Sequence, residues 1–119
     1  MMKAKFEGVT VFVVNTKSFN RGAAVTIPGV GILVGRKRFQ DIDLLRHEFG
    51  HVLQFRQKGF FYFWLKIAPA SLRSAFLSSK RENHIHMHTW TEYTANQLSY
   101  EYFNRPSYWD FRNFPLAGD

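Results

Sequence analysis

The sequence contains no cysteine, and this absence limits the chemistry that the chain can carry. Disulfides, zinc ribbons and thiolate nucleophiles are excluded, so any zinc site must use histidine and carboxylate ligands. Prolines are also few, at 4 among 119 residues, and no internal repeat is visible. Because 45% of the residues are hydrophobic and 18% aromatic, we expect residues 1–119 to fold as a single domain with its own core.

Acidic residues are scarce, because 9 Asp and Glu stand against 16 Lys and Arg and leave a formal net charge of +7. Such a charge attracts nucleic acid, anionic lipid or acidic peptides. The basic residues are scattered, however, and accompany no nucleic-acid motif. We therefore expect a solvated basic surface and no nucleic-acid partner.

A long apolar run is also missing. Residues 60–77 are apolar and aromatic, but Lys66, Pro69 and Arg73 interrupt them well short of the roughly 20 residues that span a bilayer. We expect a buried helical hairpin that covers a sheet, with a peripheral contact to a membrane surface as the alternative. The N-terminus does not resemble a signal peptide, so the expected location is cytoplasmic, with membrane association as the alternative.

Hydrophobic patterns predict strands and helices on both sides of this segment. A strand is expected at 10–15, and a hairpin is expected from 23–27 to 30–35 around a proline–glycine turn. The glycines of 30–35 favour an edge strand. Helices are expected over 41–59 and about 90–103. The sequence thus predicts an α+β domain in which a short antiparallel or mixed sheet packs on both helices.

The first helical pattern contains an H-E-x-x-H motif, formed by His47, Glu48 and His51. Residues four apart lie on one face of a helix, so the two imidazoles can hold one metal ion while Glu48 faces a water on that metal. Phe49 and Val52 belong to an apolar stripe on another side. We therefore expect the helix to bury that stripe and to turn the histidines toward a cleft, with Glu48 as general base.

A catalytic zinc site requires a third protein ligand and leaves its fourth position for water. Gln54 and Gln57 exclude the metzincin extension, which would have Gly and His at these positions. The best candidate is Glu92, which shares a helix face with Asn96 one turn later. The alternative is a capping box, in which Glu92 would only satisfy the backbone N–H of Thr89.

The H-E-x-x-H motif followed by Glu92-x-x-Ala95-Asn96 resembles the gluzincin metallopeptidases, and the minigluzincins in particular. The resemblance implies a zincin-like fold, Zn²⁺ as the cofactor, peptide or protein substrates and Glu92 as a zinc ligand. It also implies that Asn96 replaces an aspartate that orients the first histidine. An amide can accept the imidazole N–H but lacks the charge that raises ligand basicity.

Three alternating histidines precede the second helix, namely His84, His86 and His88. One of them can replace Glu92 as a ligand, join a second site or stabilise an oxyanion, whereas the plain interpretation is a solvated loop. Further oxyanion candidates, which the sequence does not rank, are Tyr100, Tyr102 and Arg105.

These patterns together predict a zinc-dependent metalloendopeptidase. The edge strand Gly31 to Gly35 is expected to lie above the metal and to pair with an extended peptide. The aromatic tail 107–119 is expected to dock on the body. Because some minigluzincins resemble forms closed by their own tail, the alternative is a latent or inactive zinc-binding domain whose cleft this tail blocks. A nucleic-acid-associated protease similar to the SprT-like class is a further hypothesis, although that class usually adds a cysteine zinc ribbon.

Overall fold

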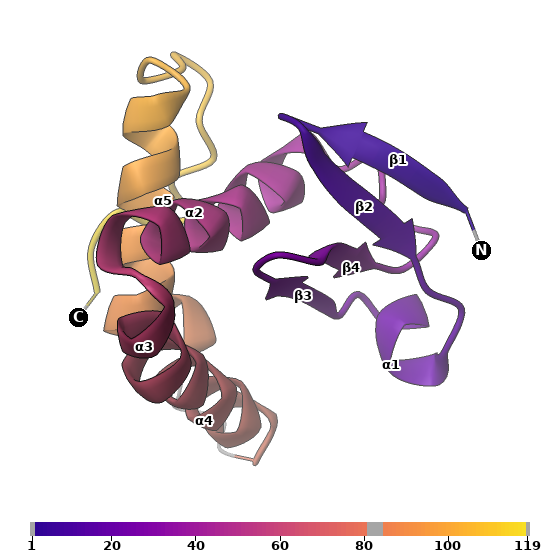
Figure 1. The fold of residues 1–119 in the computed structure, drawn as a ribbon, viewed down its shortest axis with the longest axis horizontal. Coiled ribbons are helices and arrows are strands. Elements are labelled where there is room, and N and C mark those ends of the chain that lie inside the picture. The colour runs from indigo at the N-terminus through magenta and orange to yellow at the C-terminus, as the bar shows by residue number, and fades with distance from the viewer. Residues whose placement is uncertain (1, 81–84, 119) are drawn as a thin grey trace.

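The structure is a computed structural model that describes residues 2–80 and 85–118. A four-stranded sheet forms one side of the molecule and helices form the other, with α2 lying between the sheet and α5 (Figure 1). The elements in chain order are β1 (Lys3–Phe6), β2 (Val9–Val13), α1 (Lys17–Asn20), β3 (Ala24–Ile27), β4 (Gly31–Val34), α2 (Ile42–Lys58), α3 (Phe60–Tyr62), the π-helix η1 (Phe63–Ile67), α4 (Ala68–Lys80), the 3₁₀ turn η2 (His86–His88) and α5 (Trp90–Tyr102).

The sheet is mixed and has the order β1-β2-β4-β3. β1 pairs with β2 and β3 with β4 in antiparallel fashion, whereas β2 and β4 run parallel. The expected hairpin of β3 and β4 is therefore confirmed, as is the α+β class. β1 was not anticipated, because its pattern of exposed lysines and half-buried apolar residues is short and ends in a Glu-Gly turn.

β4 is an interior strand, so the expectation that it forms the edge is wrong. Its glycines are explained by close packing against backbone instead. A Cβ atom at Gly31 would lie 2.3 Å from the carbonyl oxygen of Thr10, and one at Gly35 would lie 2.0 Å from that of Phe19. The edge strand next to α2 is β3.

α2 is the best-predicted element, and it is buried on two sides. It begins after Asp41, whose carboxylate accepts a hydrogen bond from the backbone of Leu44, and ends at Gly59, whose φ of +90° favours glycine. Leu45, Phe49 and Val52 face the core as expected. The opposite face, which carries the histidines, packs against α5, and His47, Glu48 and His51 line a cleft there, as expected.

Residues 60–80 form one run of helix, so the expected buried hairpin over the sheet is wrong. α3, η1 and α4 follow one another without a turn and extend away from the sheet (Figure 1). Pro69 lacks a backbone N–H and crowds the preceding turn, which accounts for the wider π-helical turn before it. Only one side of this run is buried, through Phe63, Ile67 and Ser74. Among the described residues, no helix is both long and apolar enough to span a bilayer.

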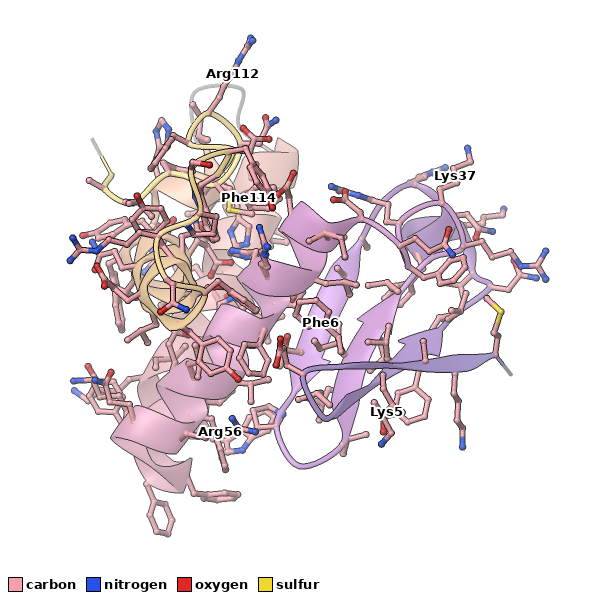
Figure 2. The ribbon with its side chains drawn as sticks, turned by 90° about the horizontal axis from the view of Figure 1, so that it is seen from above. Lys5, Phe6, Lys37, Arg56, Arg112 and Phe114 are labelled. Carbon is pink, nitrogen blue, oxygen red and sulfur yellow. The ribbon has the colours of Figure 1, made fainter. Side chains whose placement is uncertain are left out.

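The aromatic tail docks on the body, as expected. Trp109 and Phe114 are buried and join a core cluster with Val11, Ile32 and Leu45. The indole N–H of Trp109 donates to the carbonyl oxygen of Phe114 at 3.0 Å, which closes the tail on itself. Figure 2 shows Phe114 next to α2.

Candidate metal centre

α2 brings the side chains of His47, Glu48 and His51 into one buried group. The imidazoles lie one helical turn apart, with their ring centroids 5.0 Å apart, and all three residues are less than a tenth exposed. One potential ligand atom from each of the three residues lies within 4.8 Å of those of the other two. The H-E-x-x-H motif therefore has a geometry that can hold a metal ion.

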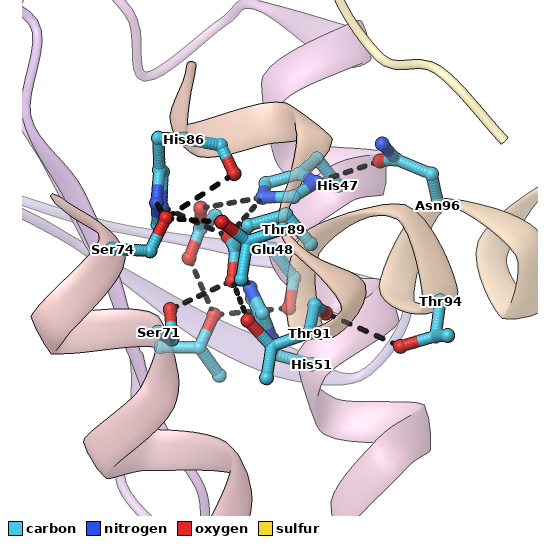
Figure 3. Close-up of polar contacts among 12 residues, drawn as sticks. His47, Glu48, His51, Ser71, Ser74, His86, Thr89, Thr91, Thr94 and Asn96 are labelled. Atoms are coloured by element: carbon cyan, nitrogen blue, oxygen red, sulfur yellow. Dashed lines mark hydrogen bonds and ion pairs between the residues drawn. The ribbon is translucent and has the colours of Figure 1, made fainter. Parts of the chain in front are cut away.

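α5 adds Glu92 to this group. Its Oε1 atom lies 3.2 Å from Nε2 of His47 and 3.1 Å from Nε2 of His51. Figure 3 shows these two histidines with Ser71 and Thr91 nearby. The other oxygen accepts hydrogen bonds from the hydroxyls of Ser71, at 2.7 Å, and Thr91, at 2.8 Å. The carboxylate is thus turned into the protein, and Thr89 makes no side-chain cap, so the capping-box interpretation finds no support.

Side-chain amides hold both imidazoles by their Nδ1 atoms. Nδ1 of His47 lies 2.6 Å from Oδ1 of Asn96, and Nδ1 of His51 lies 2.7 Å from Oε1 of Gln54. The amide nitrogen of Asn96 donates to the carbonyl oxygen of Pro115, and that of Gln54 donates to the carbonyl oxygen of Thr91. These donations turn both amide oxygens toward the rings, so Nδ1 carries a proton, and the neutral form of each ring would offer Nε2 to a metal.

The distances within the group fit a tetrahedral ion. Ligand atoms that lie 2.0–2.1 Å from a tetrahedral zinc are separated by about 3.3–3.4 Å. The separations of 3.2 and 3.1 Å from Oε1 of Glu92 to the two Nε2 atoms are close to this value. Two neutral imidazoles and one carboxylate are also a donor set that zinc commonly uses.

The pKa values of His51 and Glu92 show that the buried carboxylate is balanced by a positive charge. Burial alone would lower the pKa of His51, but the charge of Glu92 and a hydrogen bond to it raise that pKa to about 9. Burial alone would raise the pKa of Glu92, yet His51 and the hydrogen bonds from His47, His51 and His86 hold it well below its ordinary value. Without a metal, a proton on His51 therefore compensates the buried carboxylate.

His86, one of the two alternating histidines that the structure describes, reaches this group. Its Nε2 lies 3.1 Å from Oε1 of Glu92, and its Nδ1 lies 2.9 Å from the hydroxyl of Ser74, which also contacts Thr89. Among the described residues that line the cleft, His86 is present and His88 is not. His84 lies outside the described residues.

The other oxyanion candidates lie away from the group. Tyr100 packs against Trp109 and Phe111, Tyr102 is exposed, and Arg105 pairs with Glu101 on the surface. Their polar atoms therefore do not reach the carboxylate of Glu92 or the two histidines of α2. Residues that sequence reasoning did not assign to the site occupy it instead, chiefly Thr26, Gln54, Ser71 and Ser74.

A cleft of about 450 Å³ lies against the cluster. The edge strand β3 forms one wall, where the hydroxyl of Thr26 lies 2.8 Å from Oε1 of Glu48. η1 and α4 form the other wall with mainly apolar side chains, namely Phe63, Trp64, Ile67, Ala68, Leu72 and Ala75. Among the described residues, none after Glu92 lines the cleft, so the docked tail does not fill it.

Comparison of the chain with protein-family models, with curated proteins and with solved structures finds no match.

Proposed function

We propose that the protein is a zinc-dependent metallopeptidase of gluzincin type with a small zincin-like fold. The observation that carries this proposal is the convergence of Nε2 of His47 and Nε2 of His51 on Oε1 of Glu92, at 3.2 and 3.1 Å. In this proposal these three residues hold Zn²⁺, and Asn96 and Gln54 orient the imidazoles.

Glu48 is suited to proton transfer in this site. A bound zinc ion supplies a Lewis acid that polarises a scissile carbonyl and makes water nucleophilic near neutral pH. Oε1 of Glu48 accepts a hydrogen bond from Thr26, while Oε2 lies 3.8 Å from Nε2 of His47, one of the atoms that would hold the ion. From there Glu48 takes the proton of the attacking water and passes it to the departing amine.

The substrate is a peptide in extended conformation. β3 is the free edge of the sheet next to α2, and it also forms a wall of the cleft. A peptide can add to this edge through main-chain hydrogen bonds, as peptides do at other sheet edges. The apolar side chains of η1 and α4 on the opposite wall favour peptides with hydrophobic residues beside the cleaved bond.

Metal analysis and peptide hydrolysis test the proposal together. The purified wild-type protein is expected to bind one Zn²⁺ and to cleave fluorogenic peptides. His47→Ala and Glu92→Ala should lose the metal, whereas Glu48→Gln should keep it and lose about 10²–10⁴-fold in rate. Glu101→Gln, an exposed change on α5, is the matched control. If Glu48→Gln cleaves as fast as the wild type, the assignment of the base is wrong.

A second candidate is a zinc-binding domain without turnover, and the position of His86 favours it. Its Nε2 approaches Oε1 of Glu92 as closely as the two other histidines do, so it can complete a closed set of four protein ligands. In that case His86→Ala should weaken zinc binding and create peptidase activity. In the peptidase, the same change should keep the metal and reduce the rate, because an oxyanion donor is lost.

A further inference from the structure

The helical run from α3 to α4 carries an apolar face that residues 2–80 and 85–118 leave uncovered. We define the aromatic face as Phe60, Phe61, Tyr62, Trp64, Leu65 and Leu72, all exposed. Phe61, Leu65 and Leu72 are 75%, 72% and 66% exposed, and their spacings of four and seven residues place them on one side of the helix. Contiguous exposed patches of this kind mark interaction surfaces.

The orientation of this face is fixed by the opposite side of the helix. Phe63 and Ile67 are almost fully buried, and Ser71 donates to the carboxylate of Glu92 at 2.7 Å. The helix therefore cannot rotate to hide the aromatic face without breaking contacts with the candidate metal centre. The exposure is a property of the folded protein, and burying the face requires a partner.

The charges around the face indicate which partner. Between Glu48 and Glu82 the chain has no acidic residue, and its charged residues there are all basic: Arg56, Lys58, Lys66, Arg73, Lys80 and Arg81. Lys66 and Arg73 are exposed beside the aromatic face, and Nζ of Lys58 lies 5.7 Å from the ring centre of Tyr62. Two copies that joined through this face would bring like charges together, which disfavours a dimer.

We propose that the aromatic face docks on an anionic lipid surface, with the helix lying in the plane of the interface. Aromatic and leucine side chains with flanking lysine and arginine are the composition of such interfacial helices. The apolar side chains enter the boundary of the acyl chains, and Lys66 and Arg73 remain among the headgroups. This binding requires no metal.

Docking also determines where the cleft opens. Trp64 and Leu72 belong to the aromatic face and also line the cleft. With the face on a bilayer, the cleft lies at the membrane surface. Its substrates would then be peptide segments at that surface, an extension that rests on the proposed peptidase function.

Vesicle flotation with the full chain tests the docking. The wild-type protein is expected to bind vesicles of phosphatidylcholine that contain phosphatidylserine, and to bind pure phosphatidylcholine vesicles much less. The double variant Phe61→Ser/Leu65→Ser should lose at least tenfold in partitioning. Each of Lys66→Gln and Arg73→Gln should lose about fivefold at low salt. Tyr108→Ser removes an aromatic residue that is 78% exposed on the tail, and it should bind like the wild type.

Several outcomes would overturn this inference. The first is failure of the wild type to bind anionic vesicles, and the second is a loss of vesicle binding in Tyr108→Ser as large as that in Phe61→Ser/Leu65→Ser. The third is a concentration-dependent dimer that Phe61→Ser/Leu65→Ser abolishes. The Glu48→Gln variant separates this inference from the proposed function, because it should float like the wild type. An inactive protein that still binds vesicles would contradict only the peptidase, and an active protein that does not bind would contradict only the docking.

Discussion

At the scale of single residues, the side-chain amides of Asn96 and Gln54 hold the two imidazoles of the proposed zinc site. Asn96 accepts a hydrogen bond from His47 and donates one to the carbonyl oxygen of Pro115, so it connects the candidate metal centre with the tail. A carboxylate at this position would add charge but lose the donation to Pro115. Compared with an aspartate, Asn96 would therefore make the imidazole of His47 a less basic ligand, but it connects α5 with the tail.

Asn96→Ala should lower zinc affinity by about 10–100-fold, because the ring of His47 loses the group that fixes its orientation and tautomer. Competition with a chelator of known affinity measures this change. Gln97→Ala is a matched control, since Gln97 lies on the same helix and donates to the carbonyl oxygen of Leu116 in the tail, but does not reach an imidazole. Equal losses in both variants would mean that the tail, and not the imidazole contact, determines the affinity.

The raised pKa of His51 predicts that zinc binding releases protons. With a folded-state pKa of about 9, against 6.5 for an ordinary histidine, His51 is protonated in the metal-free protein at pH 7.5. A metal binds only the neutral ring, so about one proton per ion must leave from this residue. Zinc affinity should therefore increase as the pH rises toward 9.

Titration calorimetry at pH 7.5 in two buffers with different ionisation enthalpies measures this release. The observed heats should differ by about the difference between the two ionisation enthalpies for each ion bound. The same titration at pH 9.5 is the control, where the buffer dependence should fall. Identical heats in both buffers at pH 7.5 would contradict a protonated His51.

At the scale of elements, the separation of α2 and α5 determines whether Glu92 can reach the histidines. The helices meet at two small residues, Gly50 and Ala95, and the hydroxyl of Ser99 donates to the backbone of Arg46 at 2.6 Å. A Cβ atom at Gly50 would lie 2.2 Å from the carbonyl oxygen of Ala95. Glycine in the middle of this helix is therefore required by packing.

Gly50→Ala tests this packing. Alanine favours a helix over glycine by about 1 kcal/mol, but overpacking against a rigid backbone costs about 1–3 kcal/mol and moves α5 with its ligand. We expect a lower melting temperature and a weaker zinc site, measured by circular dichroism and metal analysis. Gln57→Ala, at an exposed position of α2, is the control. A more stable variant that retains its metal would refute the argument.

Sequence patterns predicted some features of the helices and missed others. α2 was predictable, because its cap, its apolar stripe and its C-terminal glycine are all local signals. The buried face of α5 was not, because Thr91, Asn96 and Ser99 are polar and their burial depends on α2 and the tail. The larger apolar side chains of α5 do not mark its buried face, because Tyr102 is exposed and Leu98 is only half-buried.

In the candidate site, too, the sequence predicted residues that lie close together along the chain and missed several that come from distant segments. Spacing along one helix predicted His47, Glu48 and His51, and the family resemblance pointed to Glu92 and Asn96. Thr26 and Ser71 reach the site from distant parts of the chain. The sequence did not indicate which of the three alternating histidines would reach the site, and the position of η2 shows that His86 does. The tertiary structure alone supplies these contacts.

At the scale of the whole molecule, the tail belongs to the folded body and lies outside the cleft. Trp109 and Phe114 are buried in the main core, the ring of Phe114 lies 5.6 Å from that of His47, and Pro115 holds Asn96. The tail therefore packs against the candidate metal centre from outside the cleft. A latent form that is released by removing the tail does not agree with this position.

Deletion of residues 106–119 should consequently reduce stability and zinc affinity without creating peptidase activity. Truncating one buried large aromatic side chain costs about 3–5 kcal/mol, and the deletion removes two of them. Phe114→Ala is the milder variant for the case in which the deletion does not fold, and it should weaken zinc binding through His47. Tyr108→Ala, which changes an exposed position of the same tail, should affect neither quantity. Thermal melting, metal content and hydrolysis of a fluorogenic peptide measure the three effects, and a truncated protein that folds and cleaves faster than the full chain would establish the tail as an inhibitor.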